Sequence, residues 1–296
     1  MMIALLRPGY GRIQIPLRTL CDLLAIGLVA LGLCATTLQA AESGSSATTS
    51  DEARNEARQA IPLARIHRDH RDKVSMVLSD PSLYRRLPTD VVDCQPEMFT
   101  FLAQNPEVLV EIWRKLGVSN VQLIRTGPYT FDLTDGMGTT GTLAIVEQLC
   151  EDRAQNRVVM YSEGSYEGRP FKRPVTANCV LLLRSGSMTE TNGRPYVAAR
   201  LDTFVRLNRP SMELLARAVH PFVGKTTDRN FVDTMNFVGN LSYAAERRPE
   251  SIAQLSDGLE NIGPARRQKF VQVAHQCSQA GSPLREARAD SKTAQR

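Results

Sequence analysis

Three short stretches of the chain have residue types and spacings known from chemical sites. Gly136 to Gly141 has the G-x-G-x-x-G spacing of a dinucleotide-binding loop, in which glycine amides approach a pyrophosphate. His67 and His70 are three residues apart, which on a helix places two imidazoles on one face as metal ligands. Ser165 lies between two glycines, as the nucleophile of a serine hydrolase does.

The context of each stretch argues against the chemistry. A strand rather than a helix is predicted after Gly141, so we interpret the glycine run as a hairpin. No third ligand is spaced near the two histidines, which favours a solvated, charged helix. Ser165 directly follows Gly164, whereas the hydrolase motif has one residue between them. The sequence therefore predicts no catalytic residue, no metal site and no cofactor.

A second set of residues suits binding rather than catalysis. Aromatic side chains can line an apolar cavity, and a charged residue among apolar neighbours can orient a polar head group. The candidate ligand-binding residues are Trp113, Tyr129, Tyr161, Glu163, Arg200 and Phe204. The alternative is that the aromatic residues pack the core and the charges face water. If Glu163 and Arg200 point inward, they must pair or orient a ligand, because an unpaired buried charge is costly.

Four cysteines follow the first forty residues. They are Cys94, Cys150, Cys179 and Cys277. Four cysteines allow three pairings, and one or two disulfides are ordinary in an oxidising compartment. The alternative is buried free thiols, because Cys179 lies within an apolar strand and can pack there. Both interpretations remain open, and the pairing is not predicted.

About six strands between Val121 and Leu207 must position these residues. Apolar and polar residues alternate along several of these runs, which is typical of strands with two different faces. Glycine, proline, asparagine and aspartate separate the runs, so neighbouring strands should pair antiparallel. A shorter strand is predicted from Leu83 to Val92. Pro88 within it has no backbone N–H to donate to a neighbouring strand, so this strand lies at an edge or breaks in two.

Helices are predicted on both sides of this sheet in the chain. Two short helices begin at Pro96 and Pro106. A longer helix from about Thr227 to Glu246 has apolar residues every three to four positions, which suits a helix lying across a sheet. Two further helices, over 251–259 and 264–277, are interpreted as packing additions.

The two ends of the chain predict export and disorder. Residues 1–41 have arginines, an apolar run and small residues near Ala40, which is typical of a cleaved signal peptide. The alternative is an uncleaved membrane anchor, although the run is shorter than the ~20 residues of a spanning helix. We expect a flexible linker over 42–58, one domain over 59–277 with a core at about 83–247 and a helical appendage at 248–277, and a disordered tail over 278–296.

Composition argues against a nucleic-acid partner. The formal net charge is +5, of which the leader contributes +2 through Arg7, Arg12, Arg18 and Asp22. The remaining basic residues are interleaved with acidic ones, rather than gathered in a stripe with stacking aromatics. Hydrophobic residues make up 42% of the chain and charged residues 23%, as in globular proteins. The oligomeric state is not predicted.

The order of one strand, two helices, six strands and a long helix covers residues 83–246. This order resembles the helix-grip fold of the START and polyketide-cyclase-like (SRPBCC) superfamily. The resemblance implies an α+β fold in which a curved antiparallel sheet of about six to seven strands grips a long C-terminal helix around an apolar cavity, with additional helices at both ends. That superfamily has no shared catalytic motif, so it implies no site residue. Pro88, Pro221 and Gly224 depart from the pattern because they interrupt the first strand and the region before the long helix.

We therefore expect an exported, periplasmic or secreted, non-enzymatic protein that binds a lipid-like or other apolar small molecule. The first alternative is a structural or protein-interaction component of the cell envelope with the same domain packed solid. The second is a cyclase-like or hydrolase-like enzyme, which requires polar groups that converge in a cavity. Membrane contact is expected only through the leader, and only where it stays uncleaved and anchors the protein.

Overall fold

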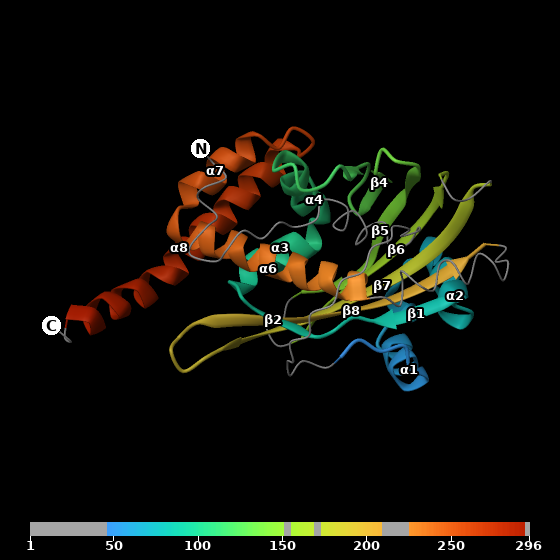
Figure 1. Cartoon of the computed structure of the whole chain (residues 1–296), viewed down its shortest axis with the longest axis horizontal. Coiled ribbons are helices and arrows are strands. Elements are labelled where there is room, and N and C mark those ends of the chain that lie inside the picture. Colours follow the sequence, from blue (N-terminus) through green and yellow to red (C-terminus); the bar gives the residue numbers. More distant parts are fainter. Residues whose placement is uncertain (1–45, 151–154, 169–172, 209–224, 294–296) are drawn as a thin grey trace.

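The computed structural model describes residues 46–150, 155–168, 173–208 and 225–293, with side chains from 227 to 281 in the last range. Within these ranges, one antiparallel sheet of eight strands is surrounded by seven α-helices and a short 3-10 helix (Figure 1). The α+β class and the antiparallel sheet are confirmed. The sheet has eight strands rather than six to seven, because the strand predicted from Leu83 to Val92 is two strands.

The strands are β1 (Leu83–Arg86), β2 (Asp90–Asp93), β3 (Gln122–Arg125), β4 (Thr130–Thr134), β5 (Thr139–Leu149), β6 (Asn156–Tyr166), β7 (Val175–Thr189) and β8 (Pro195–Leu207). The helices are α1 (Asp51–Gln59), η3 (Leu63–Arg65), α2 (Arg68–Ser79), α3 (Pro96–Gln104), α4 (Pro106–Lys115), α6 (Lys225–Arg247), α7 (Pro249–Asp257) and α8 (Pro264–Thr293). The strand order is β1-β8-β7-β6-β5-β4-β3, and β2 also pairs with β8.

The glycine run between β4 and β5 is part of a hairpin, as predicted. Gly136 and Gly138 have positive φ angles in the turn, where residues with a Cβ are strained. Gly141 lies in β5 opposite Gly164 of β6, and a Cβ on Gly141 would meet the Glu163 carbonyl oxygen at 2.6 Å. These glycines therefore allow a turn and a close approach of two strands, not the binding of a phosphate.

Helices cover both faces of the sheet. On one face of the sheet, Leu143, Met160 and Leu181 belong to the same hydrophobic cluster as Met235 and Val238 of α6, and we call this the inner face. The outer face is the opposite one, where the side chains of β6 to β8 share a second cluster with residues of α1 and α2. In Figure 1, α1 lies on the opposite side of the sheet from α3 and α6.

Helix α6 spans the residues predicted for the long helix. Its apolar residues at spacings of three to four are buried, and it contacts β2, α3, α7 and α8. Gly239 allows the helix to approach β2 closely, because a Cβ there would lie 3.1 Å from the Asp93 carbonyl oxygen. In the described part of the chain, no helix combines the length and the apolar character needed to cross a membrane.

The described ends of the chain differ from the predictions. Residues 51–59 form α1 and not a flexible linker, because Ser50 caps the helix by accepting a hydrogen bond from the Ala53 amide. Ala53 and Ala57 are buried against the outer face. Helix α8 continues to Thr293 through most of the tail predicted to be disordered. The predicted leader and the interruptions at Pro221 and Gly224 lie outside the described residues.

Candidate functional site

The six residues predicted to bind a ligand do not form one group. Trp113 of α4 lies in the inner-face cluster, where its ring contacts Phe237 of α6 edge-on at 6.2 Å. Tyr129 lies between β3 and β4 and is exposed. The other four lie on the outer face of the sheet and are Tyr161, Glu163, Arg200 and Phe204. The structure therefore separates Trp113 from most of the residues with which it was grouped.

Glu163 and Tyr161 contact each other on the outer face. The Tyr161 hydroxyl donates to Glu163 Oε2 at 3.0 Å, and Lys73 Nζ of α2 donates to the same oxygen at 3.2 Å. Burial and the neighbouring carboxylate raise the pKa of Tyr161 above its usual value. The side chains of Lys73 and Glu163 are 46% and 43% exposed, so this is a surface ion pair that connects α2 to β6.

A larger ionic cluster connects α1 to the outer face. Asp202 of β8 is 0% exposed and accepts hydrogen bonds from the Tyr84 hydroxyl at 2.7 Å, Arg86 Nε at 2.6 Å and Arg184 Nη2 at 2.9 Å. Glu56 of α1 pairs with Arg86 and Arg184. The hydrogen bond from Arg184 is the main cause that lowers the pKa of Glu56 to about 2, against the opposing effect of burial. Two buried or half-buried carboxylates thus connect three strands and a helix.

Several buried polar atoms near the inner face lack hydrogen-bond partners within the described ranges. They are Trp113 Nε1, Thr203 Oγ1 and both amide atoms of Asn230, which is 0% exposed. A buried polar group without a partner costs about 1–3 kcal/mol, so such groups are rare and call for a physical explanation. Asn230 and Thr203 were not predicted from the sequence. The available signal was that Thr203 interrupts an otherwise apolar series on β8, and no such signal marked Asn230.

The helical geometry of α6 separates Asn230 from the side of the helix that contacts the edge strands. Asp228 reaches Arg85 of the edge strand β1 with bonds of 2.6–2.9 Å. Asn230 is two positions further, about 200° around the helix, so it projects away from that edge. Phe237, seven positions after Asn230, lies on nearly the same side and contacts Trp113. Asn230 and Trp113 therefore lie on the same side of α6.

Thr203 lies on the same face of the sheet as these residues. It is the direct cross-strand partner of Arg85, whose side chain reaches α6. Along β8 and β7 the inner face continues with small or medium apolar side chains, namely Val205, Leu207, Cys179 and Ala177. All four are buried, yet they belong to neither hydrophobic cluster of the described core. We call them, with Thr203, the inner-face surface.

The neighbours of the inner-face surface on the next strands are small. Cys179 lies opposite Ser162, and Ala177 lies opposite Gly164, which in turn lies opposite Gly141. Binding sites for small molecules are mostly apolar, with a few polar groups that fix orientation. The inner-face surface, which is apolar and includes the Thr203 hydroxyl, has part of that composition.

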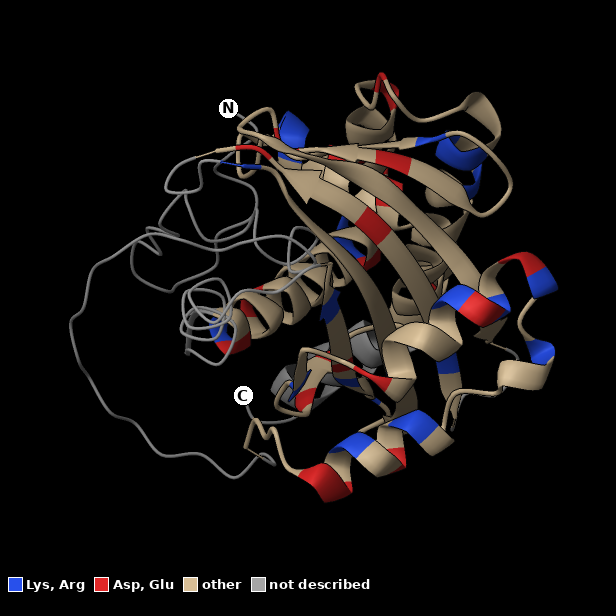
Figure 2. Cartoon of the chain, turned by 90° about the vertical axis from the view of Figure 1, so that its right-hand side faces the viewer, with Lys and Arg blue, Asp and Glu red and all other residues tan. Residues whose placement is uncertain are grey.

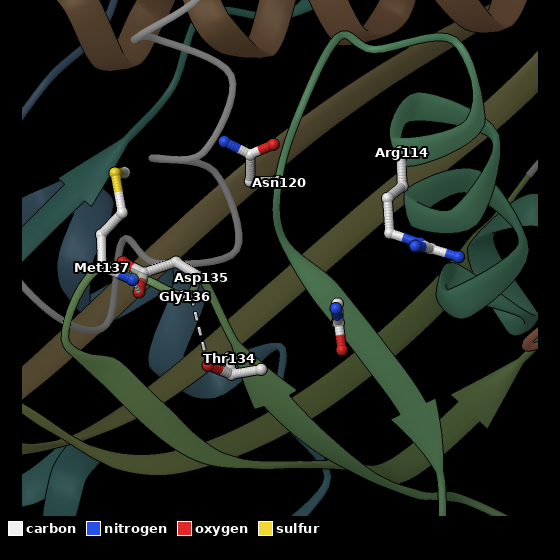
Figure 3. Close-up of a pocket in the computed structure, with 7 residues that line it drawn as sticks. Arg114, Asn120, Thr134, Asp135, Gly136 and Met137 are labelled. Carbon is white, nitrogen blue, oxygen red and sulfur yellow. Dashed lines mark hydrogen bonds between the residues drawn. The ribbon is translucent and has the colours of Figure 1, made fainter.

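A separate pocket of about 340 Å³ opens near the β4–β5 turn (Figure 3). It is lined by Arg114, Asn120, Gln122, Thr134, Asp135, Gly136 and Met137. Most of its polar groups already have partners. Asp135 accepts from the amides of Met137 and Thr139 at 2.7 and 2.9 Å, and Arg114 pairs with Glu111. Because the turn and this ion pair use these groups, the pocket is less suited to recognise a ligand than the inner face.

The four cysteines are free thiols in the structure, which is the second of the two alternatives considered. Burial raises the pKa of Cys94 and of Cys179 to about 12, and it also raises the pKa values of Cys150 and Cys277. A thiol whose pKa lies far above neutrality is a poor nucleophile.

The two histidines do not form a metal site with their neighbours. His67 caps α2 by accepting a hydrogen bond from the Asp69 amide at 3.4 Å, and the His70 ring lies 6.2 Å from the Tyr161 ring. Across 46–150, 155–168, 173–208 and the described C-terminal range, no three His, Cys, Asp or Glu side chains are placed to hold a metal ion.

No protein-family model matches this chain, and no curated protein matches its sequence.

Proposed function

We propose that the protein binds a lipid-like or other apolar small molecule without transforming it, and that the ligand lies between α6 and the inner-face surface. The observation that carries this proposal is the set of buried polar atoms without partners, which comprises Trp113 Nε1, Thr203 Oγ1 and the Asn230 amide. A ligand with polar groups would supply hydrogen bonds to these atoms.

The chemistry of these atoms indicates the kind of head group. The indole N–H of Trp113 can only donate, whereas the amide of Asn230 offers both a donor and an acceptor. A carboxylic acid, an ester or an amide has matching atoms. The nearest charged groups, Arg85 and Asp228, already form a bidentate pair, so they do not require a charged ligand.

The same atoms support binding rather than catalysis. An indole, an aliphatic hydroxyl and a carboxamide do not exchange protons near neutral pH, and they are weak nucleophiles without an adjacent base. In this proposal α6 acts as the helix of a helix-grip fold. Its burial in one cluster with inner-face residues of β5, β6 and β7 supports that role.

A ligand analysis tests the proposal. The protein is purified, extracted with organic solvent and examined by mass spectrometry, and the delipidated protein is titrated with a fluorescent fatty acid. We expect a specific co-purifying molecule and saturable binding that Asn230→Leu weakens about tenfold, the equivalent of one hydrogen bond of ~1.4 kcal/mol. Thr234→Val is the matched control, because Thr234 lies one turn along the same helix and already donates to the Asn230 carbonyl at 2.8 Å. Equal affinity of wild type and Asn230→Leu would contradict the proposed site.

We also propose that the protein is exported through cleavage of residues 1–41. The arginines, apolar run and small residues of that segment support this. Cell fractionation and N-terminal sequencing of the mature protein test it. An intact Met1 on the isolated protein would show that the segment is retained and would favour an anchor.

A further inference from the structure

Three arginines form a continuous row across the outer face of the sheet. Arg157 of β6 is the direct cross-strand partner of Arg184 of β7, and Arg184 is the direct partner of Arg200 of β8. Adjacent strands lie about 4.8 Å apart, and like charges directly opposite one another destabilise a sheet. We call these residues the arginine row. Figure 2 shows basic and acidic positions interspersed on the helices that face the viewer.

The arginine row is only partly neutralised by acidic residues. Arg157 forms two bonds of 2.9 and 3.0 Å with Glu147. Arg184 pairs with Glu56 and Asp202.

Arg200 is the least satisfied member of the row. Among the described residues its charged contact is Glu56 Oε2 at 3.6 Å, which is longer than a hydrogen bond. Burial and the charges of Arg184 and Arg86 lower its pKa. Arg184 Nε is also buried without a partner within the described ranges. Two neighbouring guanidinium groups therefore retain N–H donors.

We propose that Arg200 and Arg184 bind an oxyanion, a phosphate or carboxylate group, on the outer face of the sheet. Arginine suits this chemistry because its planar N–H groups match the oxygens of both anions. Glu56 of α1 is an internal competitor. Its side chain is 48% exposed, and its carboxylate already contacts Arg184, Arg86 and Arg200. The proposed site is independent of the inner face, because it lies on the opposite side of the sheet.

The surface next to the arginine row is apolar and open to solvent. Beyond Arg184 and Arg200, the outer face continues with Gly186 and Ala198, and then with Met188 and Tyr196. Met188 and Val91, the β2 partner of Ala198, are exposed. An oxyanion that carries an apolar group can therefore contact both the arginines and this strip. Two sources of the oxyanion fit, namely a free anion and the head group of an anionic lipid.

Calorimetric titration of the full chain with inorganic phosphate tests the site. We expect Arg200→Gln to weaken binding about tenfold, and Glu56→Gln to strengthen it by a similar factor, because each changes about one charge-assisted contact. Arg206→Gln is the matched control. Arg206 lies on the same strand and face, is 30% exposed against 29% for Arg200, and likewise has one acidic contact at 3.6 Å, to Asp80. Thermal unfolding of each variant verifies that it is folded.

A second arm identifies the source of the oxyanion. The proteins are sedimented with vesicles of a zwitterionic phospholipid, with and without an anionic phospholipid. If the wild type binds anionic vesicles and Arg200→Gln, but not Arg206→Gln, abolishes this binding, the site is supported and its ligand is a lipid head group. If the wild type binds phosphate but no vesicles, the site is supported and its ligand is a free anion. The proposal is overturned if Arg200→Gln and Arg206→Gln lose affinity equally, since charge alone would then account for binding. It is also overturned if neither wild type nor Glu56→Gln binds phosphate or anionic vesicles.

Discussion

Replacing Asn230 by leucine should stabilise the ligand-free protein. Asn230 is 0% exposed, and neither atom of its amide has a partner in the described ranges. Leucine has a similar size, lacks the buried polar atoms and has a higher helix propensity. Removing an unsatisfied buried amide should recover about 1–3 kcal/mol, and the propensity difference adds a few tenths. We expect the free energy of unfolding of Asn230→Leu to rise by roughly that amount.

Urea unfolding of delipidated protein measures this change. The dependence of the unfolding free energy on urea concentration should stay the same, because the substitution leaves the buried surface nearly unchanged. The urea concentration at the unfolding midpoint should therefore rise. Thr234→Val gives the opposite expectation. Thr234 Oγ1 donates to the Asn230 carbonyl at 2.8 Å, so its loss should destabilise the protein by about 0.5–1.5 kcal/mol.

Whether Asn230→Leu raises or lowers the free energy of unfolding shows whether the Asn230 amide lacks partners in the free protein. A loss of more than about 1 kcal/mol would mean that the amide has good partners in the free protein. The main support for a ligand at the inner face would then be gone. Adding the ligand provides a second readout, because a ligand that binds only the folded state stabilises it according to its affinity. Wild type should therefore gain more stability from saturating ligand than Asn230→Leu does.

Three further predictions concern the outer face and the hairpins. Asp202→Ala should lower the free energy of unfolding by about 3–5 kcal/mol, because Arg86 and Arg184 each lose one carboxylate partner and the buried Tyr84 hydroxyl loses its acceptor; a loss below about 1 kcal/mol in urea would show that they find other partners. The pKa of Glu56 is lowered to about 2 from 4.5, so its contribution is complete above pH 4.5 and disappears as the pH falls toward 2. Allowing for its half-exposed side chain, we expect about 1–2 kcal/mol less stability at low pH, and Glu56→Gln should remove that slope in urea titrations at several pH values. Gly141→Ala should cost about 1–3 kcal/mol, because the added Cβ would lie 2.6 Å from the Glu163 carbonyl oxygen; a wild-type thermal midpoint would show that β5 and β6 can move apart.

Alternation along the chain predicted which residues share a face, but not which face the long helix covers. Residues 197–207 alternate as predicted, with Leu201, Thr203 and Val205 on one face and Arg200 and Phe204 on the other. Both faces of β7 and β8 are rich in apolar residues, because helices cover both. Periodicity separates two faces but does not rank them, so it could not show that Arg200 and Phe204 lie on the face opposite the α6 cluster.

The residues that hold α1 could not be found from a local pattern. The helix buries only Ala53 and Ala57, so its composition resembles that of a linker. Its attachment depends on Glu56, whose partner Arg184 is 128 positions away in the chain. Local propensity describes neighbours within a few residues, and contacts at such separations become visible only once the sheet is assembled.

The long hydrogen-bonded strand β8 determines when the sheet can close. It pairs along its length with β7 on one side and with both β1 and β2 on the other, and Leu83 pairs with Val205 across more than a hundred residues. Contacts at this separation form slowly, because a long loop must close first. A ribosome releases β1, β2 and α1 long before their partner strand exists. The sheet therefore cannot close until residues 195–207 have been synthesised.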